Sequence, residues 1–241
     1  MYLLALALAP GIAIMFYIYS RDKYEKEPFK NLIISFLLGV LSTLPAILIQ
    51  VYFGDMLIGY FETKTVLYYA LFAFCVVGFG EELSKFAMLR YYSYRRKAFS
   101  EPLDGIVYSV MVSMGFATLE NIGYVYQGGY TTALVRMFLS VPAHASFGVL
   151  MGYHAGLAKF DSARSSQHLW KGLLLASFFH GAFDFFLFLQ ESPAVTQYIS
   201  ATLLFLGAIV SYWIAIRMSL RSIRLHQELS KKDYEQRITG L

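Results

Sequence analysis

Two adjacent glutamates and a lysine stand inside the stretch 77-VGFGEELSKFAMLR-90, which is otherwise apolar enough to cross a membrane. Glu81 and Lys85 are four residues apart and therefore share one face of a helix. An ionised side chain at the centre of a bilayer costs about 2.5 to 3.5 kcal/mol on insertion scales. We therefore expect Glu81, Glu82 and Lys85 to face other polar groups or a wet cavity, away from lipid.

Later apolar segments carry polar residues of the same kind. They are Glu120 in 116-FATLENIG-123, His144 and His154 in the segment after it, and His180 and Asp184 in 179-FHGAFDF-185. His180 and Asp184 again have the spacing of one helix face. Because each such group is unfavourable in lipid, their recurrence in four neighbouring segments predicts a single polar site inside a helix bundle.

These residue types support hydrolysis by either of two mechanisms. Of two carboxyl groups in a dry site, one can stay charged while the other stays protonated, so that one can act as a base and the other as an acid. A carboxylate beside an imidazole can also deprotonate a water. A second imidazole can stabilise an oxyanion or protonate a leaving amine. Alternatively, Glu81, Glu120, His144 and His180 form a reasonable ligand set for Zn²⁺, although no HExxH motif is present.

Other classes of function use the same residues. Buried carboxylates and histidines also form proton relays, so a proton-coupled transporter or ion pathway is an alternative. A transporter predicts that Glu→Gln changes alter pH-dependent flux and that no peptide is cut. A non-catalytic, partner-binding bundle would instead tolerate the loss of Glu81 or His180. Transporters often contain inverted repeats, and none is visible in this sequence, which favours an enzyme.

The elements that hold these residues follow from the composition. Of the 241 residues, 57% are hydrophobic and 15% charged, and the mean hydropathy is +0.52, whereas soluble domains are about a quarter charged. About 20 apolar residues cross a bilayer as a helix. The sequence therefore predicts an all-α polytopic membrane protein with seven, or eight, transmembrane helices. The seven segments are roughly 2–19, 31–53, 66–89, 105–126, 134–158, 170–190 and 196–217.

The distribution of basic residues predicts the orientation. Of the 20 lysines and arginines, 17 fall in alternate loops and the C-terminal tail, two (Lys64 and Arg136) fall in the other loops, and Lys85 lies inside a segment. Basic loops stay cytoplasmic, so we expect the N-terminus outside and the C-terminus inside. Residues 1–217 form the predicted transmembrane domain, and 218–241 a basic amphipathic cytoplasmic tail.

Charge and cysteine content argue against nucleic-acid binding and against cysteine chemistry. The net charge of +4 is explained by cytoplasmic loops, so we expect the lipid bilayer as a partner and no nucleic acid. The single cysteine, Cys75, lies in an apolar run and cannot form a disulfide within the chain. The sequence contains no cluster of cysteines and histidines with the spacing of a zinc finger.

Three motifs in order resemble the PrsW family of intramembrane proteases, part of the wider group that contains the CAAX prenyl endopeptidases and bacteriocin-immunity proteins. They are EExxK at Glu81, Glu82 and Lys85, FxxxE at Phe116 and Glu120, and HxxxD at His180 and Asp184. The fragments 22-DKYEKEP-28, 102-PLDGIVYS-109 and 142-PAHASFG-148 also look like that family. The likeness covers roughly residues 8 to 217.

The resemblance implies a protease of the bacterial inner membrane that makes the first, site-1, cut in a single-pass anti-sigma factor. A second intramembrane cut then frees a sigma factor for an envelope-stress response. Glu81 or Glu82 would be the general base, His180 would stabilise the oxyanion, and Asp184 would orient His180.

The sequence departs from the prenyl-endopeptidase pattern at two positions. That group has FxxxH where this chain has Phe116 and Glu120, and HxxxN where it has His180 and Asp184. His144 from the next segment can replace the missing histidine. The wider group has been described both as metal-dependent and as glutamate-only, so the resemblance leaves the use of Zn²⁺ open.

Overall fold

The computed structural model describes residues 2–239, which form helices and, within that range, no strand. This confirms the predicted all-α class. The helices are α1 (Tyr2–Arg21), α2 (Phe29–Leu41), α3 (Thr43–Tyr60), α4 (Val66–Leu71), η1 (Phe72–Gly78), α5 (Phe79–Tyr91), η2 (Ser93–Arg95), α6 (Pro102–Phe138), α7 (Ser140–Phe160), η3 (Ser162–Arg164), α8 (Ser165–Phe188), η4 (Leu189–Glu191), α9 (Pro193–Thr196) and α10 (Ala201–Thr239).

Six helical stretches in the described chain are long and apolar enough to cross a membrane. They are Tyr2–Arg21, Phe29–Tyr60, Val66–Arg95, Pro102–Phe160, Ser162–Glu191 and Ala201–Thr239. The stretch Pro102–Phe160 contains two predicted segments, 105–126 and 134–158, which correspond to α6 and α7. A helical membrane bundle is therefore confirmed, with helices at all seven predicted positions.

Helix α6 doubles back near its end and leads into α7. Gly129 has φ +67° and ψ −151°, and it is the one positive φ found in residues 2–239. Side chains with a Cβ rarely adopt this backbone region, so glycine is needed there. After the turn α7 returns antiparallel to α6, with Gly105 against Gly152 and Ser113 against His144.

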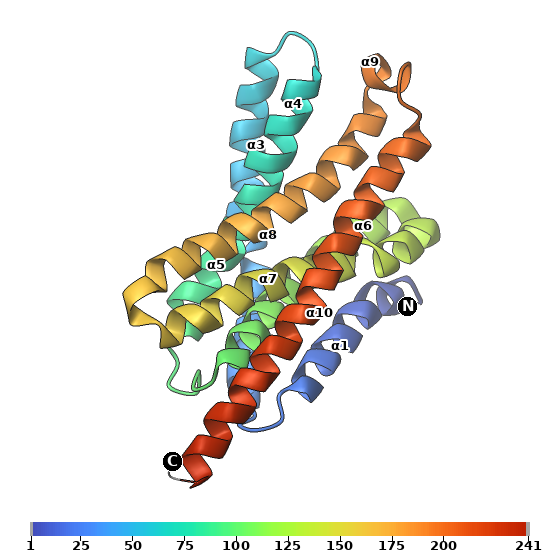
Figure 1. The fold of residues 1–241 in the computed structure, drawn as a ribbon. Helices are drawn as coiled ribbons and strands as arrows, with labels where there is room; N and C mark the ends of the chain where they lie inside the picture. The colour runs from blue at the N-terminus through green and yellow to red at the C-terminus, as the bar shows by residue number, and fades with distance from the viewer. Residues whose placement is uncertain (1, 240–241) are drawn as a thin grey trace.

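The centre of the bundle is the α6–α7 pair. Every residue of α6 from Leu103 to Ala117 is buried, whereas α3 exposes many large apolar side chains, as a helix in contact with lipid would. Glycines on α7 let the two helices touch closely, because a Cβ at Gly156 would lie 2.2 Å from the Pro102 carbonyl oxygen. Gly148, Gly152 and Gly156 form one stripe on α7, and all three lie directly against α6. Helices α1, α8 and α10 lie around this pair (Figure 1).

Helix α10 runs the length of the molecule as one unbroken helix (Figure 1). The predicted domain boundary at residue 217 falls inside it, and the division into domain and tail stays a prediction. The last part of α10 contacts the loop between α1 and α2: the Gln227 side-chain amide donates to the Arg21 carbonyl oxygen at 2.9 Å. The guanidinium of Arg237 pairs with Glu25 at 2.9 Å.

Candidate active site

The two glutamates follow a π-helical segment, η1, at the start of α5. π-Helical turns are rare and often occur at functional sites. Gly78 at the end of η1 lets this segment touch α8, because a Cβ there would lie 2.8 Å from the Gly181 nitrogen. Glu81, Glu82 and Lys85 are consequently buried between helices, with exposed fractions of 4%, 0% and 1%.

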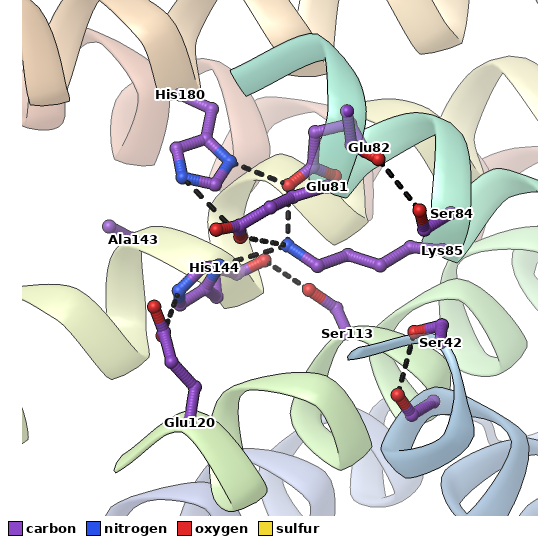
Figure 2. Close-up of polar contacts among 12 residues, drawn as sticks. Ser42, Glu81, Glu82, Ser84, Lys85, Ser113, Glu120, Ala143, His144 and His180 are labelled. Atoms are coloured by element: carbon purple, nitrogen blue, oxygen red, sulfur yellow. Dashed lines mark hydrogen bonds and ion pairs between the residues drawn. The ribbon is translucent and has the colours of Figure 1, made fainter. Parts of the chain in front are cut away.

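Glu82 contacts both Lys85 on its own helix and His180 on α8. Its Oε1 accepts a hydrogen bond from Lys85 Nζ at 2.7 Å and lies 2.9 Å from His180 Nδ1. Figure 2 shows the three side chains converging from α5 and α8. Glu82 thereby fixes the orientation of the His180 ring and neutralises the buried ammonium group of Lys85.

Glu81 has a different environment from its neighbour. Its Oε1 accepts from the Gln50 amide at 2.9 Å. Its Oε2 lies 3.5 Å from Lys85 Nζ and 3.7 Å from His180 Nε2. Glu81 lines the main cavity of the described structure, and Glu82 does not. Of the two glutamates, Glu81 is therefore the one that a water or substrate in the cavity can reach.

His144 on α7 connects the glutamates to Glu120 on α6. Lys85 Nζ lies 3.1 Å from His144 Nδ1, and an ammonium group can only donate, so Nδ1 accepts. Nε2 then carries the hydrogen and donates it to Glu120 Oε2 at 2.9 Å. The same Glu120 oxygen accepts from Arg136 at 2.6 Å. One continuous network thus joins α5, α6 and α7.

Asp184 completes the set of predicted residues. Its Oδ2 lies 3.3 Å from His180 Nε2, one helical turn along α8, and it also lines the cavity. The structure therefore brings together all six residues proposed from the sequence, in one network of direct contacts. They are Glu81, Glu82, Glu120, His144, His180 and Asp184.

The cavity beside these residues has a volume of about 720 Å³. Its walls are largely apolar and come from Ile47, Phe72, Val77, Leu119, Phe183 and Leu187. Its polar lining is Gln50, Glu81, Glu120, Tyr124, Gln127, Arg136, His144, His180 and Asp184. The site thus combines an apolar binding surface with one concentrated group of acids and bases.

Two residues of the site, Gln50 and Arg136, were not predicted from the sequence. Gln50 is the single amide in the apolar run 44–53, and this isolation is the signal that indicates a buried partner. Arg136 was counted among the loop residues, yet its guanidinium turns inward and contacts Glu120 and Asn121. The signal available in the sequence was its spacing: Arg136 precedes His144 by eight residues, about two helical turns, which places the two residues on one face.

Several other polar residues of the bundle make structural contacts. Ser84 Oγ donates to the Gly80 carbonyl at 2.7 Å, and Ser113 Oγ donates to the His144 carbonyl at 2.6 Å. Lys85 pairs with both glutamates and is buried, so its ammonium group does not reach the membrane surface. His154 does not line the cavity.

The donor set fits a zinc ion. Glu81, His144 and His180 each offer a ligand atom, and these atoms all lie within 4.8 Å of one another. Glu82 and Glu120 hold the other ring nitrogens of His180 and His144, the arrangement that orients histidine ligands in zinc sites. Glu120, the fourth predicted ligand, lies outside this group of three, and Arg136 and His144 share its Oε2.

Comparison with known proteins identifies the family. The model of the family described as PrsW family intramembrane metalloprotease matches residues 27–215. A protein named Protease PrsW from Geobacillus kaustophilus (strain HTA426) is 39% identical over 189 residues, which are 78% of this chain and 81% of that protein.

Further relatives with the same name cover still more of the chain. The one from Bacillus subtilis (strain 168) is 35% identical over 229 residues, 93% of this chain and 98% of that protein. The one from Clostridioides difficile (strain 630) is 35% identical over 201 residues, with coverage of 80% and 82%. No solved structure matches the fold. The site and these similarities agree: the chain is a membrane-embedded hydrolytic enzyme and belongs to the PrsW family of intramembrane metalloproteases.

Proposed function

We propose that this protein makes the site-1 cut in a single-pass membrane anti-sigma factor, and thereby activates an envelope-stress sigma factor. The observation that carries the proposal is the position of Glu81. Its carboxylate lies at the junction of an apolar-walled cavity and a buried His180. An apolar peptide segment and an activated water can meet at such a junction.

Glu81 is the residue we assign to water activation. The Gln50 amide holds its Oε1, which leaves Oε2 directed toward Lys85, His180 and the cavity. A carboxylate in this position can take a proton from a water as the oxygen attacks the peptide carbonyl. The proton would then pass to the leaving amine.

His180 is the residue we assign to the developing oxyanion. Its Nδ1 is fixed by Glu82, and its Nε2 lies near Glu81 and Asp184 at the cavity. An N–H donor preorganised in a dry site stabilises the tetrahedral intermediate more than the flatter ground state. Glu82 and Asp184 act as positioning residues, because they orient the ring. His144, which Glu120 orients, is the second imidazole within the site.

Zn²⁺ would be held by Glu81, His144 and His180. A bound zinc ion supplies a water with a pKa near 7 and polarises the substrate carbonyl. In that case Glu81 serves as a ligand, and Glu82 and Glu120 orient the two histidines. Sensitivity to a chelator therefore decides whether Glu81 acts as the base or as a ligand.

The proposed location is the bacterial cell membrane, with the N-terminus outside and the C-terminus cytoplasmic. The 17 basic residues on one set of loops support this orientation through the positive-inside rule. Residues 1–217 would form the protease domain. The substrate would be a single-pass membrane protein, because a transmembrane segment can supply the apolar chain that the cavity walls accommodate.

Cleavage by the purified protein in liposomes tests the proposal. The substrates are a single-pass anti-sigma-type protein and an unrelated single-pass protein, and each reaction runs with and without a zinc chelator. We expect Glu81→Gln, Glu82→Gln and His180→Ala to abolish cleavage of the first substrate. Glu62→Gln, in the exposed loop after α3, should cleave as wild type does.

Each result has a distinct meaning. Cleavage that survives all three substitutions would refute the assigned site. Equal cleavage of both substrates would refute the anti-sigma specificity but keep the site. A chelator that stops wild-type cleavage, with recovery on adding Zn²⁺, would show that cleavage depends on zinc and would favour Glu81 as a ligand over Glu81 as the base.

A further inference from the structure

A second group of carboxylates lies where the loop between α1 and α2 meets the start of α6. Asp22 and Glu27 belong to the loop, Glu101 precedes α6, and Asp104 lies in the first turn of α6. All four side chains are buried, with exposed fractions of 0%, 3%, 1% and 0%. None of them lines the catalytic cavity, and the proposed mechanism does not use them.

Each of these side chains has one oxygen that is buried and has no hydrogen-bond partner in the described structure. The four atoms are Asp22 Oδ1, Glu27 Oε1, Glu101 Oε1 and Asp104 Oδ1. Other oxygens of the cluster are engaged: Asp22 Oδ2 accepts from the Glu27 backbone at 3.1 Å, and Asp104 Oδ2 accepts from two backbone N–H groups at 2.8 Å each. Buried polar atoms are nearly always paired, so four orphaned oxygens in one place indicate a missing partner.

The geometry of the cluster suits a single ion. Oxygens of Asp22, Glu101 and Asp104 all lie within 4.8 Å of one another. A calcium ion takes oxygen ligands at about 2.3 to 2.6 Å, so it can touch oxygens about 5 Å apart, and magnesium reaches slightly less far. The carboxyl of Glu27 adjoins that of Asp104 and provides a fourth acidic group.

The four carboxylates are not neutralised by basic side chains of the described residues. Within residues 2–239, no lysine, arginine or histidine forms an ion pair with any of the four carboxylates. The nearby cationic groups have other partners: Lys159 donates to the Tyr94 carbonyl at 2.7 Å, Arg237 pairs with Glu25, and the Lys26 ammonium group lies 4.8 Å from the centroid of the Tyr19 ring. Unpaired buried carboxylates are costly, so the cluster requires a cation or bound protons.

Electrostatics in the loop supports the same conclusion. Burial, together with the neighbouring carboxylates, raises the pKa of Glu101 to about 8 and that of Glu27 to about 7. Without a cation these groups would therefore compete for protons near neutral pH. A divalent ion in the centre would let all four stay ionised.

We propose that Asp22, Glu101 and Asp104, with Glu27 beside them, bind a hard divalent cation of the Mg²⁺ or Ca²⁺ class. All donors are oxygens, which these ions prefer and which distinguishes this site from the histidine-containing catalytic centre. The ion ties the α1–α2 loop to the first turn of α6. Because α6 also carries Glu120, the ion fixes one end of a helix whose other part forms the active site.

The end of α10 covers the proposed ion site. The Leu103 backbone donates to Ser230 Oγ at 3.3 Å, and Arg237 donates to the Ser100 carbonyl at 2.9 Å. Tyr234 packs on Tyr24 of the loop with ring centroids 5.3 Å apart. The tail thereby shields the cluster from solvent, which explains the burial of residues that lie in a loop.

Thermal unfolding of the full chain in detergent tests the proposal. The protein is stripped with EDTA, dialysed, and then titrated with Mg²⁺, Ca²⁺ or Mn²⁺ alone. We expect a saturable rise in the midpoint of about 5 to 10 °C at a concentration a hundredfold above Kd. Asp22→Asn and Glu101→Gln should lose this rise. Glu25→Gln, in the same loop but outside the cluster, should keep it.

Two further measurements separate the outcomes. The first is electron paramagnetic resonance of Mn²⁺ bound to the Glu81→Gln variant, in which the catalytic ligand set is disabled. We expect one bound ion per chain in this variant. The double variant Glu81→Gln with Asp22→Asn should bind none. Without a cation, Asp22→Asn and Glu101→Gln should unfold at or above the wild-type midpoint, because they remove charge repulsion. If none of the three cations changes the unfolding midpoint of the wild type, the proposal is overturned, and the carboxylates of the cluster share protons instead. These readouts are independent of cleavage, so they do not depend on the proposed function.

Discussion

At the scale of single residues, the site is a balance of buried charges. Glu81, Glu82, Glu120 and Asp184 are acidic, and besides the two histidines they are contacted by one lysine, Lys85, and one arginine, Arg136. The excess of acid makes the site attractive to a cation or to protonated histidine. It also means that each basic residue is needed to keep a particular carboxylate in place.

Lys85 gives the clearest test of this balance. Lys85→Met removes the partner of Glu82 and should lower the free energy of unfolding by about 3 to 5 kcal/mol, the usual effect of leaving one buried charge alone. The double variant Lys85→Met with Glu82→Gln should recover much of this loss, since both charges are gone. Denaturant unfolding in detergent measures both. Equal stability of the two variants would show that the ion pair is not the source of the effect.

Arg136 tests the chain of contacts that leads to His144. Arg136→Gln removes the group that holds Glu120, and loss of such a supporting contact typically costs about 10- to 100-fold in activity or metal affinity. We expect a lower kcat for cleavage with little change in unfolding. Arg136→Lys keeps the charge and should give an intermediate rate. Arg221→Gln, on α10, is the control that should leave the rate unchanged.

At the scale of helices, glycines decide how closely the elements approach. Gly78 and Gly181 bring η1 against α8, and this contact places Glu82 beside His180. The π-helical turn in η1 then rotates the start of α5 so that both glutamates face inward. The chemistry therefore depends on a backbone contact in which neither residue has a side chain.

Gly78→Ala should separate these two elements. Its Cβ would meet the Gly181 nitrogen at 2.8 Å and the Ser177 carbonyl oxygen at 2.9 Å, and backbone atoms cannot easily move aside. We expect a loss of about 1 to 3 kcal/mol in stability and a larger loss of cleavage. Gly59→Ala, where a Cβ meets nothing within 4 Å, is the matched control. Full activity of Gly78→Ala would show that the η1–α8 contact can loosen without moving Glu82.

At the scale of the whole molecule, the orientation in the membrane fixes which side each loop faces. The basic loops, the carboxylate cluster at Asp22 and the end of α10 all belong to one end of the bundle. The short loop around Glu62, which has Lys64 as its single basic residue, joins α3 to α4 at the opposite end of the bundle, where these two helices rise together in Figure 1.

Labelling of single cysteines in intact cells tests this orientation. With Cys75→Ser as the background, a membrane-impermeant thiol reagent should label Glu62→Cys directly. It should label Asp161→Cys only after the membrane is permeabilised, because the positive-inside rule places that loop in the cytoplasm. The reverse pattern would invert the topology without changing the site.

The sequence by itself determined the fold class, the helices and the acidic and basic residues that gather between them. Hydrophobic length predicted helices at the right places because a bilayer requires about 20 apolar residues for each crossing. The cost of charge in lipid predicted that Glu81, Glu82, Glu120, His144, His180 and Asp184 belong together, and they do lie in one network. Three ordered motifs then indicated the family.

Only the tertiary structure shows how the members of that set are arranged. Which of two adjacent glutamates faces the cavity depends on the π-helical turn in η1 and its contact with α8, and neither has a periodic signature in the sequence. The inward turn of Arg136, the partner of Glu81 at Gln50, and the buried cluster around Asp22 each join residues far apart in the chain. Such contacts follow from how helices pack, because spacing along one helix fixes only which residues share its face, and not which neighbour that face meets.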